Sequence, residues 1–257
     1  MGVIKLPQIV AVTNQKGGVG KTTTCSSLVS GLSMSGYRVL GVDMDPQGNL
    51  GFSLGIDIEN GLTIYDLLKG DAKAGETIRH TEFGDVLPSN ILLSSAELEF
   101  NRAGREFMLK SALEPLNDFY DFIIIDTPPA LNILTVNAYV ASDSLIIPMV
   151  PEVLSLLGIS QLKDTIEVVK KFYNPRLKIL GVLLIKYNRR LNLVKEVEEL
   201  TAAIAEQLET ANFKAKIRSN VAVAEAPAHG QSVLSYAPKS NAAADFNALI
   251  KEILAML

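Results

Sequence analysis

The most constraining feature of the sequence is a glycine-rich loop that joins a short apolar run to a helical segment. The apolar run is Ile9-Val10-Ala11-Val12-Thr13, and the helical segment extends from Thr22 to about Gly36. A strand that turns through glycines into a helix leaves backbone N–H groups pointing into an open concavity, where the helix dipole adds partial positive charge. This stretch therefore predicts a phosphate-binding site at the start of an α/β fold.

The residue types in the loop fit a nucleoside triphosphate. Its glycines permit positive φ and a close approach of the backbone to phosphate. Lys21 is placed to reach the β- and γ-phosphates, and the Thr22 hydroxyl to ligate Mg²⁺. The expected nucleotide contacts in the loop are Gly17, Gly18, Val19, Gly20, Lys21, Thr22 and Thr23. A glycine-rich turn with incidental lysines is the rival interpretation, but the strand, the loop, the Lys-Thr pair and the helix all coincide.

Acidic residues follow two later apolar runs. The run 37–42 ends in Asp43-Met44-Asp45-Pro46-Gln47-Gly48-Asn49, and the run 122–125 ends in Asp126-Thr127-Pro128-Pro129. Ligands of α/β sheets bind at the carboxyl ends of the strands. We therefore expect Asp126 to lie beside Thr22 and hold the metal, often through water. An acid after the earlier run is expected to orient water beside the γ-phosphate.

Strands that alternate with helices predict the fold class. Further apolar runs lie at 144–150 and 180–185, with an amphipathic helix at 156–169 between them. This alternation predicts right-handed crossovers and an α/β fold with a single doubly wound, mostly parallel sheet and helices on both faces, as one domain over 1–257. Residues 50–118 are less informative. They suggest a helix at 62–68 ended by Gly70, extended pieces at 85–89 and 91–93, and a long or broken helix from 95 to 116.

Composition excludes several classes of protein. The single cysteine, Cys25, leaves no intrachain disulfide and no cysteine-rich metal or cluster site within one chain. The sequence has no signal-like leader and no apolar run near the ~20 residues that span a bilayer, so a cytoplasmic protein is expected. A net charge of −4 argues against bulk nucleic-acid affinity. The stretch 163–190, however, carries eight basic and two acidic residues, which predicts a local positive face.

Three motifs resemble one family of ATPases. The loop K-G-G-V-G-K-T has Gln15 where the general phosphate-loop pattern has glycine, and it adds Lys16 at its start. In this it resembles the deviant Walker A motif of the ParA/MinD class, while D-M-D-P-Q-G-N and D-T-P-P resemble that family's switch I and switch II. The resemblance covers nearly the whole chain and implies a P-loop NTPase fold. It also implies that Lys16 reaches a partner's nucleotide across a dimer interface, that Asp45 positions the attacking water, and that Asp126 is the Walker B acid.

The resemblance assigns further roles beyond residue 185. Asn188 aligns with the position that contacts the adenine edge, and Arg190 with an arginine that contacts DNA backbone. Lys186 and Arg189 are expected on the same DNA face, with a solvated charged edge as the rival interpretation. The family's Pro-Arg-Asn appears as Arg218-Ser219-Asn220, which leaves base selectivity open. Arg218 is expected to serve both the nucleotide and DNA, and His229 to be a loop residue.

The resemblance to ParA/Soj partition ATPases implies a function. We expect an Mg²⁺-ATPase that dimerises around ATP, binds DNA without sequence preference, lies on the nucleoid, hydrolyses ATP slowly and is stimulated by a ParB-like partner in chromosome or plasmid partitioning. No membrane role is expected, because the polar face of the last helix carries only Lys251, balanced by Glu252. Two alternatives stay open. One is the same switch positioning a division regulator, microcompartment or chemosensory array, and the other is a non-hydrolysing ATP-binding DNA scaffold.

Overall fold

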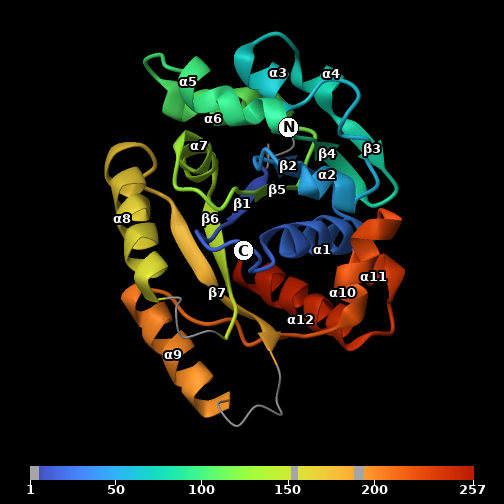
Figure 1. Cartoon of the computed structure of the whole chain (residues 1–257), viewed down its shortest axis with the longest axis vertical. Coiled ribbons are helices and arrows are strands. Elements are labelled where there is room, and N and C mark those ends of the chain that lie inside the picture. Colours follow the sequence, from blue (N-terminus) through green and yellow to red (C-terminus); the bar gives the residue numbers. More distant parts are fainter. Residues whose placement is uncertain (1–5, 152–155, 188–193) are drawn as a thin grey trace, which may run out of the picture.

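A central β-sheet runs through the molecule in the order β3-β4-β2-β5-β1-β6-β7-β8 (Figure 1). The computed structural model describes residues 6–151, 156–187 and 194–257. Within these ranges all neighbouring strands are parallel except β3 and β4. The strands are β1 (Gln8–Val12), β2 (Val39–Asp43), β3 (Arg79–Thr81), β4 (Gly84–Leu87), β5 (Phe122–Asp126), β6 (Ser144–Met149), β7 (Lys178–Tyr187) and β8 (Ile217–Arg218).

Helices connect the strands and cover both faces of the sheet (Figure 1). The α-helices are α1 (Lys21–Met34), α2 (Asn49–Ser53), α3 (Ile64–Lys69), α4 (Ala74–Thr77), α5 (Ala96–Glu99), α6 (Met108–Leu113), α7 (Ile133–Ala141), α8 (Leu156–Phe172), α9 (Val194–Gln207), α10 (Val221–Glu225), α11 (Val233–Tyr236) and α12 (Asn241–Met256). Short 3₁₀ helices are η1 (Ile91–Ser95), η2 (Arg105–Phe107), η3 (Glu114–Leu116) and η5 (Ala226–His229). The predicted doubly wound α/β fold is thereby confirmed.

The two faces of the sheet form two hydrophobic cores. Successive side chains of a strand point to opposite faces, so Ile123 and Ile125 join one core while Ile124 joins the other. The first core is closed by α3, α6, α7 and α8, and the second by α1, α11 and α12. Because β5 is buried on both sides, it reads in the sequence as an uninterrupted apolar run.

The region between β2 and β5 departs from expectation in two places. Residues 91–93 were expected to be extended, but they begin the 3₁₀ helix η1 because the Asn90 side chain accepts a hydrogen bond from the Leu92 N–H (3.1 Å) and caps the turn. The antiparallel strand β3 was not predicted, since its three polar residues carry no apolar alternation. The expected helix from 95 to 116 is broken, in part at Gly104, whose φ is +79°.

Strand register brings the predicted functional segments together. Val12 of β1 and Asp43 of β2 both pair with Asp126 of β5, so three strands end side by side at one edge. The glycine loop follows β1 directly, and α1 begins at Lys21. No helix among the described residues combines the length and the apolar character needed to cross a bilayer.

Candidate functional site

The glycine loop is held in shape by its own backbone and by its neighbours. Gly18 and Gly20 have φ of +71° and +74°, a region that favours glycine. A Cβ on Gly20 would meet Ile185 Cδ1 at 2.4 Å, so β7 packs directly against the loop. At the base of the loop the Asn14 amide donates to the Pro148 carbonyl (2.8 Å), and its oxygen accepts from the Lys16 N–H (2.9 Å). These contacts fix where the loop N–H groups lie.

Lys21 is a buried cation at the start of α1. Only 7% of the residue is exposed, and its Nζ donates to the Lys16 carbonyl at 3.1 Å. Burial lowers the pKa of Lys21, while the carboxylates of Asp126 and Asp45 oppose that shift. An ammonium that has already lost most of its water is well suited to bind an anion at the loop.

Thr22 and Asp126 meet at the metal position predicted from sequence. The Thr22 hydroxyl donates to Asp126 Oδ2 at 2.6 Å. The other oxygen, Asp126 Oδ1, is buried and has no hydrogen-bond partner in the described chain. Burial raises the pKa of Asp126 to about 7, against the lowering effects of Thr22 and Lys21. An unsatisfied buried carboxylate oxygen beside a hydroxyl fits Mg²⁺, which takes one or two carboxylates together with phosphate and water oxygens.

Asp43 holds the acidic segment that carries Asp45. Its Oδ1 accepts from the Asp45 N–H (3.0 Å) and its Oδ2 from the Leu50 N–H (2.9 Å). Burial, and then the nearby Asp126 charge, raises the pKa of Asp43 well above its usual range. Asp45 is also largely buried and accepts from the Gln47 N–H (3.0 Å). Asp43 therefore positions the backbone that carries Asp45. In the sequence, the only indication of this role is the D-x-D spacing of the two residues.

A cavity of about 690 Å³ is lined by the loop, Lys21, Thr22 and Asp45 together with segments from β8 onward. Those later segments contribute Ile217, Arg218, Ser219, Asn220, Val223, Ala224, Pro227 and Phe246. The cavity thus combines groups that suit phosphates with apolar side chains that suit a planar base, as a nucleotide requires.

Arg218 is in this cavity wall, but its guanidinium has a partner. Nε and Nη2 donate to the two carboxylate oxygens of Asp245 at 2.8 and 2.6 Å, and the Arg218 N–H donates to the same carboxylate at 3.0 Å. No sequence signal links residues so far apart. The pairing balances the charge of Arg218, and contacts of this residue to nucleotide or DNA stay predictions.

The remaining predicted residues fall into two groups. Lys16 is partly buried at the start of the loop, and Lys186 places its Nζ 3.0 Å from the Gly18 carbonyl, on the loop itself. Asn188, Arg189 and Arg190 lie outside the described residues. Among other candidates, the Lys216 ammonium is paired with Glu198, and the His229 ring stacks on Tyr236 (centroids 4.9 Å apart).

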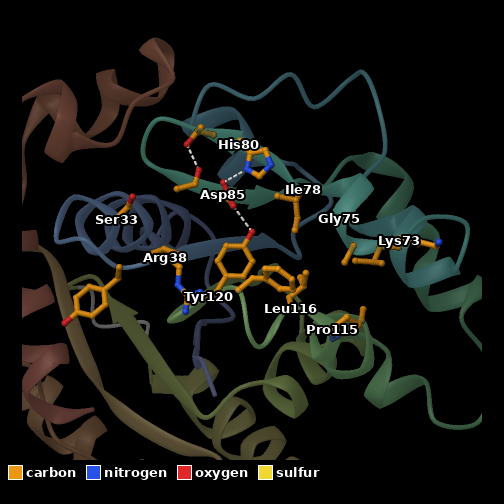
Figure 2. A pocket seen from close by; sticks show the side chains of 18 of the residues that line it. Ser33, Arg38, Lys73, Gly75, Ile78, His80, Asp85, Pro115, Leu116 and Tyr120 are labelled. Atoms are coloured by element: carbon orange, nitrogen blue, oxygen red, sulfur yellow. Dashed lines mark hydrogen bonds and ion pairs between the residues drawn. The ribbon is translucent and has the colours of Figure 1, made fainter. Parts of the chain in front are cut away.

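A second cavity, of about 940 Å³, lies at the N-terminal ends of β2 and β4, whereas the loop lies at the C-terminal ends of the strands. Figure 2 shows that His80 and Tyr120 both reach Asp85, at 2.7 Å from one carboxylate oxygen each. Arg38 is engaged in the same way by Asp121. This cavity is larger than the loop site, but the side chains of His80, Asp85, Tyr120 and Arg38 that line it are already engaged in hydrogen bonds.

Comparison with known proteins agrees with this geometry. The family model described as "AAA domain" matches residues 7–179. The chain is 44% identical to the sporulation initiation inhibitor protein Soj of Bacillus subtilis, covering 96% of this chain and 98% of Soj. It is 42% identical to the chromosome partitioning protein ParA of Myxococcus xanthus, covering 96% and 88%.

A solved structure also shares the fold. The protein described as cobyrinic acid a,c-diamide synthase from Mycobacterium smegmatis, with bound ATP analog and magnesium, superposes with a TM-score of 0.85 at 35% identity, covering 97% of this chain and 95% of that one. The family model spans more than half of the chain, and the relatives match over nearly their full length. The chain therefore belongs to the Soj/ParA family of AAA-domain partition ATPases.

Proposed function

We propose that this protein binds ATP with Mg²⁺, dimerises around the nucleotide, binds DNA without sequence preference as the dimer, and hydrolyses ATP slowly with stimulation by a ParB-like partner. The observation that carries the proposal is the Thr22–Asp126 pair, whose second carboxylate oxygen is buried and unsatisfied beside the buried Lys21. These groups fit a magnesium ion that is bound together with nucleotide phosphates. The solved relative with bound ATP analog and magnesium supports it.

Each residue of the site has a separate task in this proposal. Backbone N–H groups of the loop and the Lys21 ammonium bind the phosphates. Thr22 and Asp126 supply oxygen ligands to the metal, which when bound neutralises charge on the phosphate oxygens. Asp45 orients the attacking water, and Asp43 holds Asp45 in place through the Asp45 N–H. Such catalysis consists mainly of positioning and electrostatic stabilisation.

The dimer part of the proposal depends on Lys16. Gly17 and Gly18 are exposed, so the outer rim of the loop lies at the surface where a second copy can approach. Lys16 begins that rim, and its backbone is fixed on both sides, by Asn14 at its N–H and by Lys21 at its carbonyl. A fixed backbone at this position supports the proposal that the Lys16 side chain contacts the nucleotide of a partner, as the family resemblance implies.

The proposed DNA binding is supported by the charge of one segment and by sequence similarity to a relative. The stretch 163–190 is strongly basic in an otherwise acidic chain. Contacts to DNA phosphates need positive charge and donors but no base sequence. The relative from Myxococcus xanthus is a chromosome partitioning protein, and a nucleoid location with a ParB-like activator follows for this chain if it shares that role.

The test combines gel filtration and DNA retention on the Asp45→Ala variant, with and without ATP–Mg²⁺. Blocking hydrolysis should trap an ATP-bound dimer that stays on DNA, whereas the wild type should cycle. Asp71→Ala, an exposed carboxylate paired with Lys69, is the matched control and should behave as wild type. A variant that stays monomeric in saturating ATP–Mg²⁺ would overturn the dimer. Wild-type protein that releases no phosphate with DNA and partner present would instead indicate the non-hydrolysing scaffold.

A further inference from the structure

The end of strand β7 touches the phosphate loop through two consecutive residues. Ile185 packs its side chain against Gly20, and the Lys186 ammonium donates to the Gly18 carbonyl at 3.0 Å. Both residues line the same cavity as Lys21 and Thr22. The expected role of Lys186 was DNA contact, yet its charged end is directed at the loop that receives the phosphates.

Lys186 has an unusual backbone for a lysine. Its φ is +53°, and the only other described non-glycine residue with positive φ is Glu209. A residue other than glycine is strained in this region, and such strain persists where the surrounding structure imposes it, often at functional sites. Here the conformation coincides with a shift in the β7–β8 pairing register between Ile185 and Tyr187, where the Lys186 side chain reaches the loop.

The contact constrains one particular peptide group. The carbonyl of Gly18 and the N–H of Val19 belong to the same planar peptide, and in a trans peptide they point in opposite directions. All described peptide bonds are trans. An ammonium that holds the Gly18 oxygen on one side therefore directs the Val19 N–H to the other side. It also polarises the peptide, which makes that N–H a stronger donor to an anion.

We propose that Lys186 is a positioning residue of the nucleotide site, which orients the Gly18–Val19 peptide and adds positive charge at the loop, and so raises the affinity for nucleotide phosphates. This inference rests on the proposed ATP binding. It assigns Lys186 to the nucleotide rather than to DNA. Because the contact is already present before any reaction, it should affect binding more than the chemical step.

The test compares Lys186→Met, Lys186→Arg and Lys178→Met with the wild type. Met keeps most of the stem but removes the charge, and Arg restores a cationic donor. Lys178 is an exposed lysine at the opposite end of the same strand, and it serves as the matched control for nucleotide affinity, KM and kcat. The measurements are the Kd for ADP and for ATP–Mg²⁺ by calorimetry, Tm with and without nucleotide, KM and kcat, and DNA retention at saturating ATP.

We expect Lys186→Met to weaken nucleotide binding by roughly three- to tenfold, the effect of one solvent-exposed charge-assisted hydrogen bond. KM should rise while kcat stays near the wild-type value. Lys186→Arg should recover most of the affinity, and Lys178→Met should lose none. Tm without nucleotide and DNA retention at saturating ATP should be unchanged in Lys186→Met.

Three results would overturn the inference, and a fourth concerns the proposed function alone. Unchanged nucleotide affinity in Lys186→Met would show that the contact between Lys186 and the Gly18 carbonyl does not contribute to nucleotide binding. A lower Tm in the absence of nucleotide, without rescue by Arg, would show a structural role only. Loss of DNA retention at saturating ATP would return Lys186 to the DNA face. A wild-type protein that binds neither ADP nor ATP–Mg²⁺ would refute the proposed function itself.

Discussion

Replacing Asp126 by asparagine should stabilise the nucleotide-free protein while abolishing its use of magnesium. Asp126 is fully buried, one of its oxygens is unsatisfied, and its pKa is raised from 3.8 to about 7. A difference of about three pKa units corresponds to about 4 kcal/mol by which the ionised carboxylate destabilises the fold. The amide of asparagine removes that charge but leaves an N–H group without a partner, which costs about 1–2 kcal/mol. The expected net gain at pH 8 is about 2–3 kcal/mol.

The gain should depend on pH in a defined direction. Between pH 4 and 7 the folded chain retains a proton on Asp126 that the unfolded chain has released, so the stability of the wild type falls as pH rises through this window. Above pH 7 the Asp126 carboxyl is ionised in both the folded and the unfolded chain, so its contribution to the free energy of unfolding is constant. The Asp126→Asn variant lacks this slope, and its advantage should shrink to near zero at pH 5.

Urea denaturation in EDTA without nucleotide, at pH 5 and pH 8, measures the stability gain of Asp126→Asn and its dependence on pH. Asp71→Asn, at an exposed position, is the control and should change neither. The same Asp126→Asn protein should show no Mg²⁺-dependent gain in nucleotide affinity. If Asp126→Asn is less stable than the wild type at pH 8 in EDTA, or if its advantage is as large at pH 5, the burial argument is wrong.

Three further substitutions test other parts of the account. Lys16→Ala should retain nucleotide binding but lose dimer-dependent hydrolysis; phosphate release that is unchanged across protein concentrations would refute the cross-dimer role. Arg190→Glu should weaken DNA retention at low salt and flatten its salt dependence, and an identical salt slope would place the DNA face elsewhere. Gly31→Ala should lower stability by about 1 kcal/mol, because overpacking against Ile250 and Leu234, whose nearest atoms would lie 2.2 and 2.7 Å from the new Cβ, exceeds the gain in helix propensity. Gly75→Ala in α4, where a Cβ meets nothing within 4 Å, should be neutral or stabilising, and thermal unfolding of both variants measures the difference.

The sequence predicted those parts of the fold in which local pattern and tertiary environment agree. The buried strands β1, β5 and β6 are apolar because both their faces are covered, so their runs were visible without any structure. The strand β3 and the 3₁₀ helix η1 depend on partners elsewhere or on one capping side chain, and pattern alone does not reveal them. Element type was therefore predictable where burial decides it and unpredictable where a single hydrogen bond does.

The candidate site shows the same division. Thr22 and Asp126 were predicted as neighbours because each directly follows a strand or loop of the same sheet edge, and the 2.6 Å contact confirms their proximity. The Asp245 partner of Arg218 and the Gly18 contact of Lys186 were not predicted, since both join side chains that only tertiary packing brings together. From the sequence, Lys186 had been assigned to DNA, and Arg218 to both the nucleotide and DNA.

The outermost strands of the described sheet limit how copies of this chain can associate. β3 has three residues and β8 has two, so each offers very little unpaired backbone to another chain. Long open edges invite strand-by-strand growth into fibres, whereas short ones discourage it. The proposed dimer is therefore expected to form through loops and helices and not through pairing of edge strands, which would leave it open to control by a ligand bound at those loops.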